Sequence, residues 1–315
     1  MPSIDIVHPT TLLGKEVRER IDAFPSLSGD LRLLSPKETE VGTLTEARGE
    51  AAVVVRLGQN LPLADIVLFC GSIEETRPLL VELPATSTGI VLSPWATVAD
   101  GTPVVAGVNL STAKRGMVLV SPSAGAVGLA RLLQPLRPLG VMSASATVLQ
   151  PASLHGDEAL QELFDQARNI LTFAAPPPSP IFDGQMAFNM RLGPPDGTAL
   201  RDHLASVLDD SVELSAQTVQ AGIFHGVSVS VELRFAMDPG AEAIQKAWRD
   251  TDGIEIFEPG NRLGPIDAAQ SDMLLLGELR AEPQRPGTYW AWATIDNLTA
   301  AGAINALHLA DAVVG

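Results

Sequence analysis

Apolar residues follow two different patterns along the chain. In the first third, short apolar runs alternate with helical patterns, and the run 65–69 is apolar almost throughout rather than at alternate positions. Such runs are typical of parallel strands covered by helices on both faces. The pattern therefore predicts a doubly wound parallel sheet. Its predicted strands are Ser3–Val7, Leu31–Leu34, Ala51–Val55, Ile66–Cys70, Gly89–Leu92 and Gly116–Val120, with a helix over Thr11–Phe24.

The middle of the chain changes to a period of two. In Val212–Gln220 and Val227–Phe235, apolar side chains recur at every second position, as in a sheet with one solvated face. This change predicts a second, α+β domain with a largely antiparallel or mixed sheet. Pro176–Pro180 is expected to be an extended connector within it, because proline interrupts helices. Thr299–Val314 has helical spacing and is expected to close the chain as a helix.

Composition narrows the class of protein. The 315 residues predict about two domains, and a hydrophobic content of 46% is enough for a buried core. The formal charge of -16 would repel nucleic acid and anionic membranes, so we expect neither as a partner. The only cysteine, Cys70, fits a reducing compartment, and no long apolar run occurs, so we expect a cytoplasmic protein. The five scattered histidines predict no metal site.

Six stretches, spread in order over nearly the whole chain, match the pattern of one family. They are Ile6–Glu16, Val104–Asn109, Ser121–Ala124, Gln185–Met190, Gln220–Val227 and Trp292–Leu298. Together they resemble aspartate-semialdehyde dehydrogenase, an NADP-dependent oxidoreductase of amino-acid biosynthesis, and more narrowly its bacterial homologue of unassigned role. The resemblance implies a Rossmann-type nucleotide-binding domain at 1–123 and 298–315. It also implies a catalytic and dimerisation domain at 124–297, and a homodimer.

The family's reaction, as the resemblance implies it, uses a cysteine thiolate to attack an aldehyde, passes hydride to NADP and releases the acyl group to phosphate. That thiolate lies in an Asn-Pro-Asn-Cys motif at a helix N-terminus, which lowers its pKa. Here Ala124 stands at the nucleophile position, and a methyl group cannot form the covalent intermediate. Ser123 is the nearby substitute, although we expect it to cap the helix. Cys70 is expected to be a buried, inert thiol.

The family's general base is a histidine in a Phe-x-Gly-His pattern, and that position holds Val227. His225 lies two residues away, on the same face of an extended segment if no bulge intervenes, and a polar structural role is favoured for it. The stretch Leu92–Asp100, which matches the family's phosphate-holding segment, contains no arginine. Where the family has substrate-binding basic residues, this chain has Asp202, His203, Asp209, Asp210 and Glu213.

The dinucleotide loop also departs from the family. A Gly-x-x-Gly-x-x-Gly turn lets backbone N–H groups approach a pyrophosphate, but 8–14 keeps only its last glycine, and Pro9 has no N–H. We expect a loop that only packs, so that the cofactor is either none or residual NADP. The residues that would serve residual binding are Thr10, Thr11, Leu12 and Gly14, with Ser35 and Lys37 near the place where the family binds the 2'-phosphate, and Asn297 near the nicotinamide.

Taken together, these replacements predict a catalytically silent homologue that acts as a dimeric binding or scaffold protein, including as a partner of an active paralogue. Two alternatives stay open. One is an active oxidoreductase that uses NAD(P) noncovalently on a different carbonyl substrate, since hydride transfer to a simple ketone or aldehyde needs no cysteine. The other is a small-molecule sensor that uses the same site without turnover. The residues leave open whether the chain is an enzyme.

Overall fold

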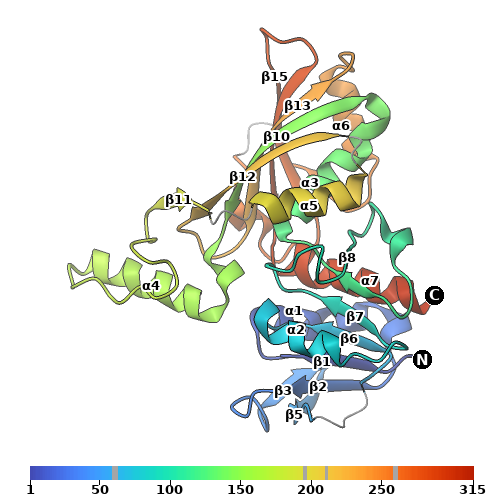
Figure 1. Ribbon diagram of the computed structural model, residues 1–315. Coiled ribbons are helices and arrows are strands. Elements are labelled where there is room, and N and C mark those ends of the chain that lie inside the picture. Colours follow the sequence, from blue (N-terminus) through green and yellow to red (C-terminus); the bar gives the residue numbers. More distant parts are fainter. Residues whose placement is uncertain (59–62, 194–196, 210–211, 258–261) are drawn as a thin grey trace. The chain divides into compact units, whose positions relative to one another are not determined.

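The computed structural model describes residues 1–58, 63–193, 197–209, 212–257 and 262–315. The chain folds into two compact units. Unit 1 consists of Met1–Ser123 and Leu298–Gly315, and unit 2 consists of Ala124–Asn297. Each unit has its own seven-stranded sheet (Figure 1).

Unit 1 is built on a parallel sheet with the order β5-β2-β1-β6-β7-β9-β8. The chain runs outward from β1 in both directions, so the switch point of the sheet lies between β1 and β6, where α/β proteins bind their ligands. Its strands are β1 (Ile4–Val7), β2 (Leu31–Ser35), β5 (Val55–Arg56), β6 (Ile66–Phe69), β7 (Thr88–Val91), β8 (Thr102–Pro103) and β9 (Val118–Val120). Its α-helices are α1 (Leu12–Arg20), α2 (Ile73–Val81) and α7 (Asn305–Val314).

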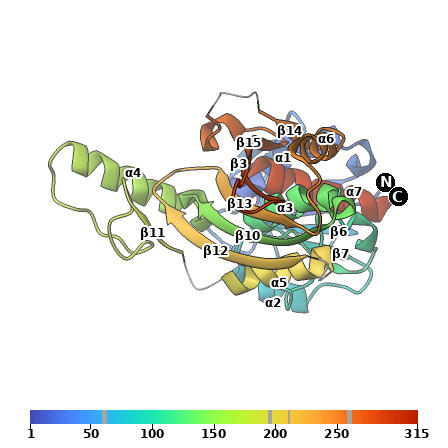
Figure 2. The same cartoon turned by 90° about the horizontal axis from the view of Figure 1, so that it is seen from above.

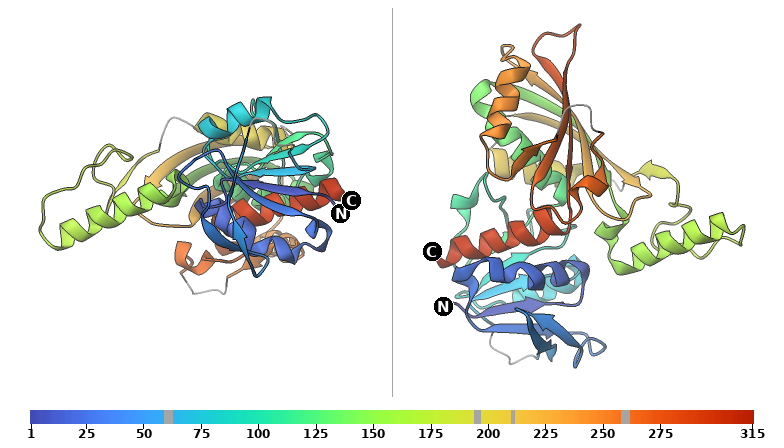
Figure 3. Two further views of the ribbon diagram at one scale, coloured as in Figure 1. Left: turned by 90° about the horizontal axis from the view of Figure 1, so that it is seen from below. Right: turned by 180° about the vertical axis from the view of Figure 1, so that it is seen from behind.

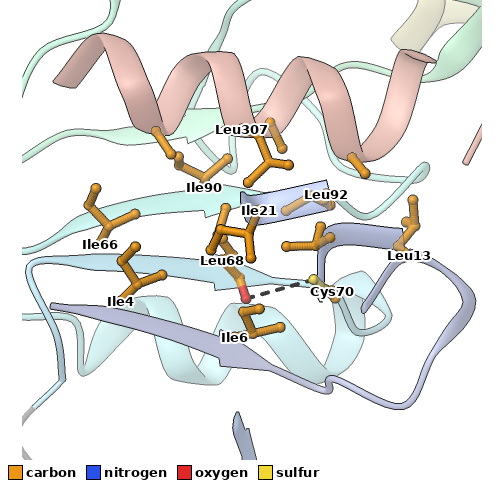
Figure 4. Close-up of a cluster of buried hydrophobic side chains, with 14 of the residues drawn as sticks. Ile4, Ile6, Leu13, Ile21, Ile66, Leu68, Cys70, Ile90, Leu92 and Leu307 are labelled. Carbon is orange, nitrogen blue, oxygen red and sulfur yellow. Dashed lines mark hydrogen bonds between the residues drawn. The ribbon is translucent and has the colours of Figure 1, made fainter. Parts of the chain in front are cut away.

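Both faces of this sheet are buried. Ile6 and Leu68 belong to a cluster that includes Leu307 of α7, and Figure 4 shows these side chains between the strands and that helix. Val67 and Phe69 belong to a second cluster with Ile73 of α2, on the opposite face. Covering both faces explains why these strands are apolar almost throughout.

Two segments of unit 1 differ from the sequence prediction. Ala51–Val55 was expected to be one strand of the sheet, but β4 (Glu50–Val53) pairs with β3 (Leu44–Ala47) in a separate hairpin. Its turn has left-handed backbone at Arg48 and Gly49, which the twist of a two-residue hairpin favours. The C-terminal helix is present, but its first turn, Thr299–Ile304, is π-helical.

Unit 2 is built on a mixed sheet with the order β11-β12-β10-β13-β16-β15-β14. The pairs β10/β12 and β14/β15 are parallel, and the others are antiparallel. Its strands are β10 (Val141–Gln150), β11 (Met190–Leu192), β12 (Glu213–Ala221), β13 (Val227–Phe235), β14 (Ile254–Ile256), β15 (Leu274–Ala281) and β16 (Thr288–Ile295). Its α-helices are α3 (Ala124–Leu133), α4 (Asp157–Leu171), α5 (Gly197–Leu208) and α6 (Ala241–Arg249). The predicted fold class is therefore confirmed.

One face of this second sheet is covered by helices of the same chain, among them α3 and α5 (Figure 2). A Cβ atom at Gly125 of α3 would lie 2.8 Å from Val148 of β10, and the glycine lets the helix approach the sheet. The apolar residues of β13, which include Val229 and Val231, are buried. Helix α4 instead projects beyond the edge strand β11 (Figures 1 and 3).

Candidate functional site

The loop between β1 and α1 places a histidine at the switch point of the sheet in unit 1. His8 has φ 58°, a left-handed conformation that glycine adopts without strain, and its side chain is fully buried. The imidazole lies against Gly71, which follows β6. A Cβ atom at Gly71 would come within 2.4 Å of Cδ2 of His8. The histidine therefore fills the space between the loop and the end of β6.

Thr11 begins helix α1 as its N-cap. Its hydroxyl accepts a hydrogen bond from the backbone N–H of Gly14 at 3.1 Å. The same hydroxyl lies 3.0 Å from the carbonyl oxygen of His8 and 2.9 Å from that of Cys70, to either of which it can donate. Gly14 itself has no room for a side chain, because a Cβ atom would lie 2.4 Å from the His8 carbonyl oxygen. The threonine thus uses one of the N–H groups that a helix N-terminus would otherwise offer to an anion.

Charged side chains surround the buried imidazole. Nδ1 of His8 lies 3.8 Å from a carboxylate oxygen of Glu40, and Nε2 lies 3.9 Å from one of Glu75. These separations are too long for hydrogen bonds, and neither ring nitrogen has a hydrogen-bond partner in the described part of the chain. Lys37 is 2.7 Å from the other oxygen of Glu75, and its backbone N–H binds the buried Ser35 hydroxyl at 3.0 Å. The ammonium group of Lys37, which the resemblance places near the 2'-phosphate, is therefore paired with Glu75 within the chain.

This environment shifts two pKa values. Burial lowers the pKa of His8 below its ordinary value; the nearby charges of Glu75 and Glu40 oppose this shift, and Lys37 adds to it. Burial alone would raise the pKa of Glu75, but its hydrogen bond with Lys37 and the neighbouring His8 leave that pKa below its ordinary value. The loop therefore favours the neutral form of the His8 imidazole and the ionised form of Glu75.

Cys70, the only cysteine of the chain, directly follows strand β6. Its thiol is 3% exposed, and burial raises its pKa to about 12. Sγ lies 3.9 Å from the Leu68 carbonyl oxygen, a contact drawn in Figure 4. A thiol in this environment is almost entirely protonated near neutral pH and is a poor nucleophile.

The residues that the resemblance assigns to catalysis lie in and beside unit 2. Ala124 is the first residue of α3 and is buried, and the half-buried Ser123 directly precedes it in the chain. Val227 is the first residue of β13, is fully buried, and pairs with Ile295 of β16. Helix α3 and β13 are in contact. These positions carry a methyl and an isopropyl group, so they supply neither a nucleophile nor a base.

His225 does not lie on the same face as Val227. Gly226 between them has φ 85°, and the chain bends there instead of running as an extended strand. The His225 side chain is exposed whereas that of Val227 is buried. The period-two argument therefore fails at this point, and the bend directs the imidazole away from the buried face of the sheet.

Asn297 is held by the residues around it. Its carboxamide oxygen accepts a hydrogen bond from the Gly226 backbone N–H at 2.8 Å, and its amide nitrogen donates to the Ser153 hydroxyl at 3.0 Å. Neighbouring Asp296 accepts a hydrogen bond from the Gln270 backbone N–H at 2.7 Å. These contacts give Asn297 a structural role in unit 2, where it fixes the bend that precedes β13.

The segments that match the family's substrate-binding regions carry mostly acidic side chains, and several of these form ion pairs within the chain. Arg77 of α2 forms a two-pronged contact with Asp100, at 2.7 and 3.1 Å, and its hydrogen bond lowers the pKa of that carboxyl. The sequence prediction missed Arg77 because it lies outside the matched stretch. In unit 2, Asp209 pairs with Arg137 at 2.7 Å, and His203 is buried in α5. Asp210 lies outside the described residues.

The sequence prediction also missed both glutamates beside His8. Only Glu75 had a local signal, because Ser72 and Glu75 form a capping box at the start of α2. Glu40 lies in irregular chain after β2, so its approach to His8 depends on tertiary structure alone. Among the described residues, no group of three or more His, Cys, Asp or Glu side chains is arranged to hold a metal ion.

A doubly wound parallel sheet with the β1–α1 loop at its switch point, together with a separate mixed sheet, defines a two-unit α/β protein whose first unit is of the Rossmann type. The family model of the semialdehyde dehydrogenase dimerisation domain matches residues 133–300. The chain belongs to this family. The resemblance to aspartate-semialdehyde dehydrogenase is thereby confirmed.

Relatives and solved structures agree with this assignment. An aspartate-semialdehyde dehydrogenase of Rickettsia conorii is 25% identical over 79% of this chain and 79% of its own. A USG-1 protein homolog of Azotobacter vinelandii is 28% identical over 99% of this chain and 98% of its own. A probable aspartate-semialdehyde dehydrogenase of Pseudomonas aeruginosa has the same fold, with a TM-score of 0.92 at 23% identity over 99% of this chain and 98% of its own.

A more distant structure, the Candida albicans enzyme with NADP, has a TM-score of 0.70 at 14% identity over 99% of this chain and 98% of its own. Within the described ranges, no helix has the length and apolar character needed to cross a bilayer.

Proposed function

We propose that this chain is an aspartate-semialdehyde dehydrogenase homologue that has lost the cysteine-dependent reaction and acts as a dimeric binding or scaffold protein. The observation that carries the proposal is the absence of a usable thiol. Ala124 occupies the first position of α3, and the only cysteine is buried with a pKa of about 12. The family's acyl-enzyme step needs a thiolate, and no atom of Ala124 can replace it.

The test is an assay of purified protein with aspartate semialdehyde, NADP and phosphate, followed by the absorbance of NADPH. We expect no rate above that of the buffer. A measurable rate would contradict the proposal, and two variants would locate its source. A rate lost in Ser123→Ala would indicate a serine nucleophile. A rate that survives Ser123→Ala but not His225→Ala would indicate a base-assisted reaction without a covalent intermediate.

The dimer is the second part of the proposal, and its surface is argued from exposed apolar residues. The apolar face of β13 offers no such surface, because α3 contacts that strand within the same chain. The segment 157–192, which we call the arm, is different. Its exposed large apolar side chains are Phe164, Ile170, Leu171, Phe173, Phe188, Met190 and Leu192. Phe173 is 97% exposed. So many on one segment are typical of an interaction surface.

We infer that a second copy of this chain covers the arm, because the matching family is a dimerisation domain and its match includes the whole arm. A related, active subunit could use the same surface. The proposed reducing, cytoplasmic setting rests on the single cysteine. Light scattering on a sizing column is expected to give twice the chain mass of 33.1 kDa.

Leu171→Glu with Phe173→Glu is expected to shift the protein to a monomer. Met237→Glu is the matched control, since Met237 is 83% exposed but lies outside the arm. A wild-type monomer, or arm variants that remain dimeric, would contradict this part of the proposal.

A further inference from the structure

The loop after β1 raises the question of whether this chain still binds the dinucleotide of its family. A Rossmann-type loop binds pyrophosphate through close approach of the backbone, free N–H groups at a helix N-terminus and a favourable charge. Each requirement can be compared with contacts inside unit 1. The question is separate from catalysis, because a protein without a nucleophile can still bind NADP.

Space at the loop is occupied by the chain itself. The His8 imidazole is fully buried and lies against Gly71, so close that a Cβ atom there would be 2.4 Å from the ring. Glycine at position 8 would adopt the observed left-handed backbone without penalty and would leave this space empty. The backbone of the loop is therefore compatible with a glycine loop, and the histidine side chain closes it.

Hydrogen-bond donors at the loop are reduced as well. Pro9 has no N–H, and the N–H of Gly14 is bound by the Thr11 hydroxyl. A threonine that caps its own helix competes with any anion for the same N–H group. The loop retains the helix N-terminus but has given up part of its ability to bind a phosphate group.

Charge at the loop opposes an anion. The carboxylates of Glu40 and Glu75 lie within 4 Å of the His8 ring nitrogens, at 3.8 and 3.9 Å. Lys37 is the cation of this cluster, and its ammonium group is paired with Glu75. A diphosphate placed beside these two carboxylates would be repelled in a partly desolvated environment.

The geometry points to a self-closed nucleotide loop: His8 fills the pyrophosphate position, Thr11 takes one of its donors, and the glutamates repel the ligand. NADP, which the fold family implies, does not fit the residues present, and we infer that the wild-type chain does not bind it at this loop. The inference goes beyond the proposed function, which concerns the missing thiol and the dimer.

The experiment is calorimetric titration of the full-length chain with NADPH and NADH up to about 1 mM, in the wild type and in His8→Gly/Thr11→Gly. We expect no binding to the wild type. For the double variant we expect a dissociation constant of about 100 µM or lower, which is at least about tenfold below the highest nucleotide concentration used. Adding Glu75→Gln is expected to free Lys37 and so favour NADPH over NADH. His225→Gly/Thr172→Gly, altered at two exposed positions of unit 2, is the control and is expected to behave as the wild type.

Three results would overturn the inference. They are wild-type binding of either nucleotide with a dissociation constant below about 1 mM, a folded double variant that still binds neither, and nucleotide-dependent protection of 10–14 from hydrogen exchange in the wild type. The exchange experiment needs no variant, so it decides the question even if the double variant does not fold. Wild-type binding without turnover would overturn this inference and leave the proposed function standing, whereas turnover would overturn the proposed function.

Discussion

The β1–α1 loop of unit 1 and the first positions of α3 and β13 in unit 2 depart from the family pattern in different ways. In the loop, as the resemblance implies, small residues are replaced by larger polar ones. His8 fills the space beside Gly71, and the Thr11 hydroxyl accepts the hydrogen bond of the Gly14 N–H. At Ala124 and Val227, reactive side chains are replaced by smaller or inert ones, as the resemblance implies. The backbone needed for a ligand loop persists in the first region. The second lacks atoms that no change of conformation can supply.

The two departures from the family pattern differ in what would be needed to reverse them. A closed loop can be reopened by removing atoms, because the left-handed backbone at His8 already suits glycine. A missing nucleophile requires new atoms and a microenvironment that lowers their pKa. Binding is therefore expected to be recovered with fewer substitutions than catalysis.

The largest expected effect concerns the only thiol. Because burial raises the pKa of Cys70 to about 12 and leaves it 3% exposed, its reaction with an aromatic disulfide reagent at pH 8 should be about a thousandfold slower than in denaturant. The measurement is the release of coloured thiolate over time. Ala236→Cys, at an exposed position, is the control and should react rapidly. Fast labelling of the native wild-type thiol would mean that a reactive sulfur exists and would remove the contrast between the two regions.

A second prediction tests whether Asn297 is structural, as its contacts in unit 2 indicate. Asn297→Ala leaves the buried Gly226 N–H and the Ser153 hydroxyl without their partner. We expect a loss of about 2–3 kcal/mol in the free energy of unfolding of the chain, measured by urea denaturation. Asn169→Ala removes an exposed bond to the Ala175 carbonyl oxygen and should cost less than about 1 kcal/mol. Equal effects would show that the Asn297 contacts add nothing beyond an exposed bond.

Regular elements with strong patterns could be predicted from the sequence. Val227–Phe235 was predicted with its observed bounds, because one face of the strand is buried and the alternation is strict. The hairpin at β3 and β4 was missed, since its short apolar run resembles a buried strand and its turn depends on left-handed backbone at Arg48 and Gly49. The π-helical turn at Thr299–Ile304 was missed because a helical pattern does not reveal a changed hydrogen-bond register.

The candidate site was less predictable, because its contacts join residues far apart in the sequence. Capping of α1 by Thr11 follows local rules, as does the placement of Glu75 at the start of α2. The approach of Glu40 and Glu75 to His8 requires the packed sheet and could not be read locally. Exposure of His225 depends on the bend at Gly226, which interrupts the alternation that precedes β13.

A third prediction sharpens the contrast by testing the loop without any ligand. Thr11→Ala removes the N-cap of α1 and is expected to lower the free energy of unfolding by about 1 kcal/mol. Thr10→Ala, one residue earlier and outside the cap, is the matched control and should have a smaller effect. The measurement is again urea denaturation. If the two variants were equally stable, the Thr11 hydroxyl would contribute nothing to the helix, and its competition for the Gly14 N–H would be doubtful.

The smallest expected effect is the pH dependence contributed by His8. Because its pKa in the folded chain lies below the ordinary value, the unfolded chain binds more protons between the two values, and stability rises with pH in that interval. The contribution is present above about pH 6.5 and is lost as the pH falls towards the folded-state value. We expect the wild type to lose stability relative to His8→Asn as the pH falls from 7.5 to 5.

Asparagine tolerates the left-handed backbone at this position, so the comparison isolates titration from strain. Urea denaturation at several pH values checks this expectation. If the wild type instead gained stability relative to His8→Asn on acidification, the imidazolium would be paired with Glu40 and Glu75. The loop would then hold a stabilised positive charge, and the electrostatic part of its closure against an anion would no longer hold.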